Sequence, residues 1–400
     1  MSRLSRNLEM AVAGLFALAI LVAGGVALIV STTEQPLYTD PAAIPSTTAA
    51  EPGKRYSAAV EEARRLARGL LVKEEYLPAL SIAVGVDGEI VWAEGFGFLD
   101  AERQARATPS TRFRTGSVSK TLTAAAAALL HDRGRLDLDA AVQKYVPAYP
   151  QKQWTVTTRQ LLGDVAGVHR IRGDANDQMP RGYCATVDEA LKTFAYEPLL
   201  FEPGTEYRFS TSGWILLSAV IEGAASEPFA TFMSREILAP LGMKRTALEG
   251  TAGTDADRDS VPYYLRSKDD DAESQTAPAA DYACFFGAGA FLSTPSDLVR
   301  LGSAWLKPGL LKAETLTLFQ TPLQLRSGPS TFALGWSVGN VPLAGAPARV
   351  VRHRANIIAG YVSFTMFPDH GLVIAAMSNV ASSGVDPFTL QVADRFASVR

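Results

Sequence analysis

Strand patterns lie near both ends of the chain, whereas its middle is typical of helices and loops. LSIAVGV (80–86) and EIVWAEGFG (89–97) flank Asp87-Gly88, a pair that favours a two-residue hairpin turn. Four more strand patterns stand near the other end: LGWSVGN (334–340), RVVRHRA (349–355), YVSFTMFP (361–368) and GLVIAAMSN (371–379). The sequence therefore predicts one antiparallel sheet built from both ends of the chain.

Helical spacing of apolar residues predicts the helices. It is clearest at 56–73, and Phe113–Thr115 is a short strand pattern before a helix that begins near Ser117. The other predicted helices are 187–195 after a capping box at Thr186–Glu189, 214–225, 228–238, 295–306 after Thr294-Pro295, and 386–398. The fold class is thus α+β, an α/β sandwich whose antiparallel sheet is flanked by helices and interrupted in sequence by a helical subdomain.

The N-terminus differs from the rest of the chain. Met10 to Val30 carries no charge and is long enough to span a bilayer, and Arg3 and Arg6 precede it. Gly25-Val26-Ala27 is a poor cleavage site, so we predict an uncleaved membrane anchor, with a cleaved signal as the alternative. The positive-inside rule then places the following domain on the periplasmic or extracytoplasmic side.

Composition divides the chain into three parts. Residues 1–31 form the predicted anchor or signal segment, and 32–53, which are rich in Thr, Ala and Pro without apolar periodicity, form a predicted flexible linker. Residues 54–400 form one predicted domain, with 251–281 as a solvated excursion. We find no internal repeat.

Charge and composition restrict the partners. The net charge of −3 and the lack of a basic patch argue against nucleic acid. Four histidines without metal-ligand spacing argue against a metal site, and no cofactor is expected. Outside the cytoplasm, Cys184 and Cys284 either form a disulfide or remain two unpaired buried thiols, and the sequence leaves both open.

Candidate chemistry centres on FRTGSVSK, residues 113–120. Ser117 and Lys120 are three residues apart and share one face of a first helical turn. A dry site lowers the pKa of a lysine, so Lys120 can accept the proton of Ser117, and the helix N-terminus favours developing negative charge. Taken alone, the stretch favours a serine that only caps a helix.

Further motifs extend the pattern. They are LLGDVAGV (161–168), FEPGTEYRFSTSGW (201–214), LAPLGMKRTAL (238–248), GAGAFLSTPSDL (287–298), LGW (334–336) and FPDHGLVIAAMSN (367–379). With FRTGSVSKTLTA, their order and spacing resemble the serine beta-lactamase and penicillin-binding-protein superfamily, above all its branch of class C beta-lactamases, family VIII esterases and mitochondrial beta-lactamase-like proteins. The resemblance implies that Ser117 is acylated and that Lys120 is its catalytic partner.

The family's second motif, Tyr-x-Asn, falls on Phe209-Ser210-Thr211. Phe209 cannot transfer a proton, so the phenol that normally assists the lysine is missing. Tyr207 lies two residues earlier and is the candidate substitute, or else a partly buried structural tyrosine. Thr211 keeps a hydrogen-bonding group at the position of the asparagine.

The third motif, K-T-G or H-[ST]-G, is also altered. It falls on Arg354-Ala355-Asn356, or on His353-Arg354-Ala355 if one residue is inserted. Either alignment keeps a cation that can hold a substrate carboxylate or tune Lys120, although a polar strand edge is the alternative. By resemblance, Asn356 or its neighbour supplies the second oxyanion N–H. In LLGDVAGV, Asp164 replaces the usual histidine, and we interpret it as a loop cap.

These observations predict a membrane-anchored serine hydrolase that acts on an ester, amide, lactam or small peptide. Two alternatives stay open: an acyl sensor with slow deacylation, and a non-catalytic binding or scaffold protein tethered to the membrane. The sequence does not decide whether the chain self-associates.

Overall fold

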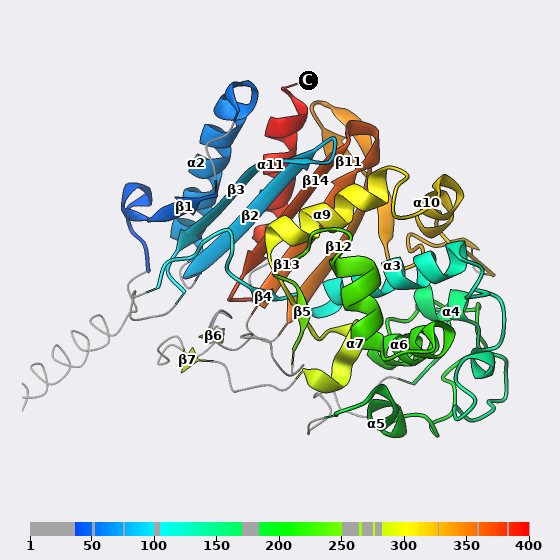
Figure 1. Cartoon of the computed structure of the whole chain (residues 1–400). Helices are drawn as coiled ribbons and strands as arrows, with labels where there is room; N and C mark the ends of the chain where they lie inside the picture. Colours follow the sequence, from blue (N-terminus) through cyan, green and yellow to red (C-terminus); the bar gives the residue numbers. More distant parts are fainter. Residues whose placement is uncertain are drawn as a thin grey trace, which may run out of the picture.

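The computed structural model describes residues 37–49, 53–74, 77–99, 105–169, 184–249, 264–265, 275–276, 282–326, 328–357, 360–381 and 384–399. Its centre is a seven-stranded antiparallel sheet (Figure 1). In spatial order the strands are β1 (Ser46–Thr48), β3 (Glu89–Gly97), β2 (Ala79–Val86), β14 (Leu372–Ser378), β13 (Gly360–Phe367), β12 (Ala346–Ile357) and β11 (Ser337–Leu343). β2 pairs with β14, with Val84 opposite Ile374, so the predicted sheet from both chain ends is confirmed.

Helices cover both faces of the sheet. Helices α2 (Ser57–Lys73) and α11 (Val385–Ala397) pack on one face, and α9 (Pro295–Leu306) packs on the other (Figure 1). Because side chains alternate along a strand, Ile82 and Val84 belong to the core under α2 and α11, whereas Ala83 belongs to the other core. Both layers bury apolar residues, which makes the domain a helix–sheet–helix sandwich.

A helical subdomain continues the α9 side of the molecule. Its helices are α3 (Ser119–Asp132), α4 (Thr158–Leu162), α5 (Val187–Lys192), α6 (Thr211–Ala225), α7 (Phe229–Phe232) with a π-helical continuation (Met233–Leu238), and α10 (Ala313–Phe319). The remaining strands are β4 (Phe113–Arg114), β8 (Phe291–Ser293) and β5 (Ala247–Leu248) in one small sheet, and the pairs β6 (Tyr264–Leu265) with β7 (Gln275–Thr276) and β9 (Gln324–Leu325) with β10 (Gly328–Pro329). The predicted α+β class is confirmed. Most of the predicted excursion at 251–281 lies outside the described residues.

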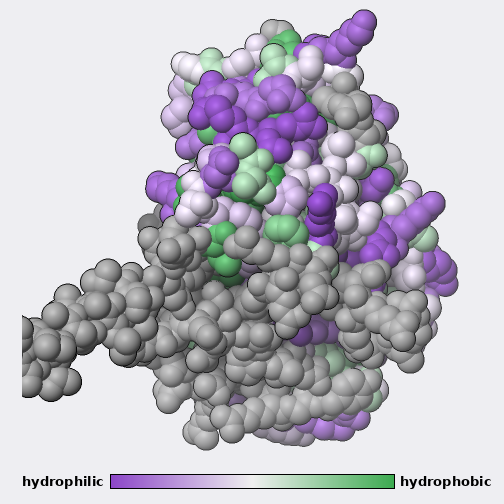
Figure 2. Space-filling model, turned by 90° about the vertical axis from the view of Figure 1, so that its left-hand side faces the viewer, coloured by the Kyte–Doolittle hydropathy of each residue, from purple (hydrophilic) through white to green (hydrophobic). Residues whose placement is uncertain are grey.

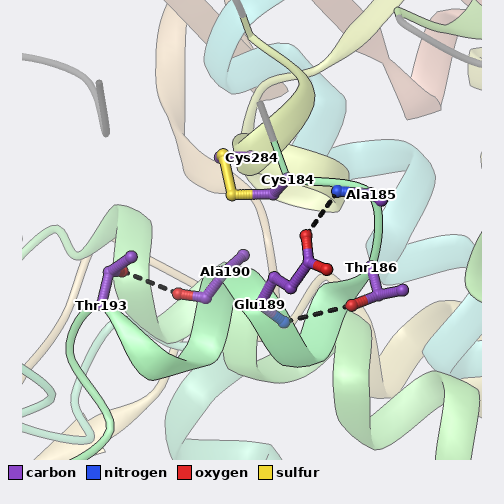
Figure 3. The surroundings of a disulfide bond; sticks show 7 residues. All are labelled: Cys184, Ala185, Thr186, Glu189, Ala190, Thr193 and Cys284. Atoms are coloured by element: carbon purple, nitrogen blue, oxygen red, sulfur yellow. Dashed lines mark hydrogen bonds between the residues drawn. A yellow bond between two sulfur atoms is a disulfide. The ribbon is translucent and has the colours of Figure 1, made fainter. Parts of the chain in front are cut away.

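Turn and cap signals explain several element boundaries. Asp87 and Gly88 both have positive φ, 54° and 97°, as a tight hairpin turn requires. The Thr294 side chain accepts a bond from the Asp297 N–H and begins α9 as predicted. At α5, Thr186 accepts from the Glu189 N–H, but the Glu189 carboxylate accepts from Ala185 rather than from the cap residue (Figure 3).

The structure corrects part of the predicted linker. Tyr38 donates its hydroxyl to the Pro78 carbonyl, Ile44 is buried, and Ser46 in β1 pairs with Phe96 in β3. Tyr38 and Ile44 are separated by one proline and by small or polar residues, a pattern without periodicity, so composition alone suggested a flexible tether. Residues 37–49 are instead folded onto the sheet edge.

The predicted membrane span, Met10 to Val30, lies outside the described residues. Within them, no single helix has the length and hydropathy to cross a bilayer. One pair bent by 74°, α6 with Phe229–Leu238, passes such a test by length and composition only. Seen from the side of α2 and β1, the described surface is mostly hydrophilic (Figure 2).

Cys184 and Cys284 form a disulfide across a sequence separation of 100 residues (Figure 3). It ties the segment just before α5 to a helical segment, Ala283–Ala288. Of the two alternatives that the sequence left open, the structure shows the disulfide.

Candidate active site

Ser117 lies in a 3-10 turn, Gly116–Val118, between β4 and α3. Thr115 fixes this turn, because its N–H and its hydroxyl both donate to the carbonyl of Phe291 in β8. Neither the turn nor α3 has a side-chain hydrogen bond at its N-cap residue, so Ser117 is not a helix cap. Its side chain is partly exposed and therefore accessible to a reactant.

Gly116 brings the end of β12 against the Ser117 turn. Its φ is +49°, and a Cβ there would lie 2.0 Å from Ile357 Cγ2 and 3.2 Å from Ala355 Cβ. A larger residue would be strained and would push the strand away. The glycine thus sets the distance between the nucleophile and the strand that carries the altered third motif.

Lys120 is buried beside Ser117. Its side chain is 1% exposed, and Nζ lies 3.4 Å from Ser117 Oγ and donates to the Ala288 carbonyl at 2.9 Å. The longer contact is weak as a hydrogen bond, but catalytic contacts are often long before substrate binds. Burial lowers the pKa of Lys120 to about 8, although Asp164 opposes this shift. A neutral lysine is therefore accessible near neutral pH, as a general base requires.

Phe209 occupies the space against the ammonium of Lys120. Its ring centroid lies 4.4 Å from Nζ, and that of Trp214 lies 5.9 Å away, so both rings interact with the cation. Tyr207 is 41% exposed, and its ring packs on Phe332 at 4.9 Å. Burial and the nearby Asp164 raise the pKa of Tyr207. The contacts described for Lys120 do not include Tyr207. The role of Tyr207 as the substitute phenol therefore stays a prediction.

Asp164 is the group that sequence reasoning underestimated. It is 3% exposed, and Oδ1 accepts from the Ser210 N–H and from Trp214 Nε1, both at 3.1 Å. Its other oxygen, Oδ2, is buried without a hydrogen-bond partner among the described residues. Asp164 thus holds the second-motif segment in place, which is more than the local loop cap we expected. The signal was a lone acid within the apolar motif LLGDVAGV.

Asp164 and Lys120 form a buried pair of opposite charge. Burial raises the pKa of Asp164 to about 7, and the charge of Lys120 opposes the shift. Their two pKa values therefore lie close together, so each protonation state of the site depends on both groups.

Strand β12 directs the third-motif candidates to opposite faces. His353 is buried on the side of Ala355 and the Ser117 turn, and its ring stacks edge-on against Phe332. Arg354 points to the other face, where Nη1 donates to Asp386 of α11 at 3.0 Å. Asn356 is exposed and, by strand alternation, belongs to the Arg354 face. The structure does not bring the side chains of Arg354 and Asn356 to Ser117.

His353 carries no charge at neutral pH. Burial lowers its pKa to about 3, and the cations Lys120 and Arg354 act in the same direction. Thr211 begins α6 and is partly exposed next to Phe209 along the chain. The candidates gathered near Lys120 are thus Ser117, Phe209 and His353, with Asp164 added. Among the described residues, no group of three or more His, Cys, Asp or Glu side chains could hold a metal ion.

The Asp164→Asn variant is expected to move the acid limb of kcat/KM for an ester to lower pH. With Lys120 as the general base, the activity of the native chain is expected to rise with pH as Lys120 loses its proton, with a midpoint near its pKa of about 8. The Asp164 carboxylate raises that pKa, so its neutral isostere lets Lys120 lose the proton at lower pH. A pH–rate profile measures the shift, and an acid limb that stays in place or moves up contradicts it.

Known proteins with similar sequences belong to a family that fits this arrangement of Ser117 and Lys120. The family model described as Beta-lactamase matches residues 63–397. "Serine beta-lactamase-like protein LACTB, mitochondrial" of Mus musculus is 26% identical, over 88% of this chain and 83% of the mouse protein. "Putative penicillin-binding protein PbpX" of Bacillus subtilis is 24% identical, over 74% of this chain and 69% of its own length.

Solved structures share the fold. D-amino acid amidase from Ochrobactrum anthropi SV3 has a TM-score of 0.72 at 19% identity and covers 86% of this chain and all of its own, 100%. The octameric penicillin-binding protein homologue from Pyrococcus abyssi has a TM-score of 0.68 at 21% identity, covering 85% of this chain and 76% of its own. At these identities the likeness establishes the fold alone.

Proposed function

The chain belongs to the beta-lactamase family, and from that premise we propose that it is an active serine hydrolase that forms an acyl-enzyme at Ser117. The observation that carries the proposal is the buried Lys120, 3.4 Å from Ser117 Oγ and with a lowered pKa. The substrate is an ester, amide, lactam or small peptide, since each presents an acyl carbon to a serine.

In the proposed reaction, Lys120 transfers every proton that moves. Neutral Lys120 takes the proton of Ser117 as Oγ attacks the acyl carbon, and the Ser117 N–H donates to the oxyanion that forms. The protonated lysine then gives its proton to the leaving group, which departs as the C–O or C–N bond breaks. Lys120 then takes a proton from a water, whose oxygen attacks the acyl carbon. The bond between that carbon and Ser117 Oγ breaks, and the protonated lysine returns its proton to Oγ, which releases the acid and restores Ser117.

Covalent labelling tests the proposal. A fluorophosphonate probe should add one adduct to the native protein, and peptide mass spectrometry should locate it on Ser117. Heat-unfolded protein is the control, because only the folded site holds Lys120 beside the serine. No adduct, under conditions that label another serine hydrolase of this family, overturns the proposal and favours the non-catalytic scaffold.

A second candidate function is an acyl sensor, because Phe209 covers Lys120 where the family's tyrosine would assist proton transfer. Such a protein would form the acyl-enzyme and lose it slowly. Intact-mass measurements over time after exposure to a penicillin or an activated ester distinguish the two. A long-lived acyl adduct supports the sensor, and rapid return to the free mass supports the hydrolase.

We also propose that residues 10–30 anchor the protein and that the domain lies outside the cytoplasm. The disulfide supports this location, since such bonds persist in oxidising compartments. Protease added to right-side-out membrane vesicles should cleave the domain, and full protection would refute this orientation.

A further inference from the structure

We propose that this site selects uncharged, apolar acyl groups and disfavours substrates whose acyl group carries a carboxylate. The inference rests on the proposed hydrolase function and specifies its substrate class. It departs from the expectation that the third motif supplies a cation for a substrate carboxylate.

The arginines of β12, the strand next to Ser117, point away from the site. Arg354 Nη1 lies 3.0 Å from Asp386 Oδ2, and Arg352 Nη1 lies 3.7 Å from the same oxygen, both on the α11 face. Asp386 is further held by the Ser363 hydroxyl at 2.9 Å. Both guanidinium groups are paired with Asp386 on the face opposite Ser117, so neither is placed to contact a substrate carboxylate at Ser117.

The inward-facing groups of β12 near Ser117 are uncharged. Ala355 and Ile357 pack against Gly116, and His353 is neutral because burial lowers its pKa to about 3. A neutral imidazole can donate one hydrogen bond and accept another, but it cannot balance the charge of a carboxylate. Within the described part of this strand, the face toward Ser117 therefore offers no cation between His353 and Ile357.

Lys120 does not fill this role. Its Nζ donates to the Ala288 carbonyl, faces the Phe209 ring and interacts with the buried Asp164. The Asp164 carboxylate already offsets the charge of Lys120, so a second carboxylate would meet repulsion in a site of low dielectric constant. An anion would also stabilise protonated Lys120 and so remove the general base.

The walls near Lys120 are apolar instead. Phe209 is partly exposed and faces the ammonium of Lys120. The ring of Phe332 lies 4.9 Å from that of Tyr207 and 6.2 Å from that of His353, measured between ring centroids. Of these three rings, that of Tyr207 is exposed. An alkyl or aryl acyl group gains burial against these rings, whereas a carboxylate there loses hydration without a partner.

Three esters with one leaving group test the inference. They are p-nitrophenyl hexanoate, the p-nitrophenyl ester of monomethyl adipate, and p-nitrophenyl adipate with its free carboxylate. We expect similar kcat/KM for the two neutral esters and a value on the order of tenfold or more lower for the free carboxylate. The methyl ester separates the effect of charge from that of chain length. Equal or faster hydrolysis of the free carboxylate overturns the inference and leaves the hydrolase function intact.

Two variants test why the carboxylate is disfavoured, and the readout is the ratio of kcat/KM for the free-carboxylate ester to kcat/KM for the methylated ester. Asp164→Asn should raise the ratio, because the repelling carboxylate is gone while any change in Lys120 affects both esters. Arg354→Met should leave the ratio unchanged, and a selective loss with the charged ester would show that Arg354 binds carboxylate after all. If esters acylate Ser117 without turnover, the same ratio is read from acylation rates by mass spectrometry. No acylation by any ester or by the fluorophosphonate overturns the proposed function and the inference together.

Discussion

Replacing Lys120 with Met is expected to lower the acylation rate of Ser117 by about 10²- to 10⁴-fold, the contribution of a positioned general base. The effect is large because Lys120 Nζ is the nitrogen that contacts Ser117 Oγ, at 3.4 Å. Methionine fills a similar volume beside Phe209 but accepts no proton. Rates of p-nitrophenyl ester hydrolysis and of fluorophosphonate labelling measure the loss.

Three controls separate the roles of charge, base and fold. Ser117→Ala should remove labelling altogether, and Lys192→Met, at an exposed residue paired with Asp188, should leave it unchanged. Lys120→Arg keeps the cation but cannot lose its proton, so it should be as slow as Lys120→Met. Near-normal acylation in both Lys120 variants would show that another group takes the serine proton.

The parts of the fold that sequence predicted well depend on local periodicity. The alternation around Asp87-Gly88 predicts the β2–β3 hairpin without knowledge of its partners, and the strand patterns at 361–379 do the same for β13 and β14. Ser117 and Lys120 were also predictable, because one helical turn fixes how they lie. Residues 37–49 were mispredicted because their order comes from contacts with β3 and Pro78 rather than from their own pattern.

The site's charges were not predictable, because they depend on long-range register. Shifting the alignment by one residue assigns the first position of the third motif to His353 instead of Arg354, and neighbouring residues of a strand lie on opposite faces of the sheet. Which of the two residues faces Ser117 is shown only by the pairing of β12 with β13 and by the contact of Arg354 with Asp386. Asp164 is 44 positions from Lys120 along the chain, and no sequence spacing indicates that the two are neighbours.

Loss of the Cys184–Cys284 disulfide is expected to lower the free energy of unfolding by about 2–5 kcal/mol. The bond closes a loop with a sequence separation of 100 residues, and long loops give the largest gain when the unfolded chain is restrained. Denaturant unfolding of the native protein with and without reductant measures the change. The Cys184→Ser/Cys284→Ser variant should match the reduced protein and should not respond to reductant.

The same loss should reduce catalysis, because Cys284 is the second residue of the segment that supports Lys120. Ala283–Ala288 ends at the carbonyl that accepts from Lys120 Nζ at 2.9 Å, and Thr123 Oγ1 donates to Gly287 in the same segment. Without the covalent tie to the start of α5, this carbonyl holds the lysine less firmly, so kcat/KM should fall under conditions where the protein remains folded. Reductant should leave the double-serine variant at its lower activity. A reduced protein with unchanged stability and unchanged kcat/KM would show that the helical subdomain positions Lys120 without the disulfide.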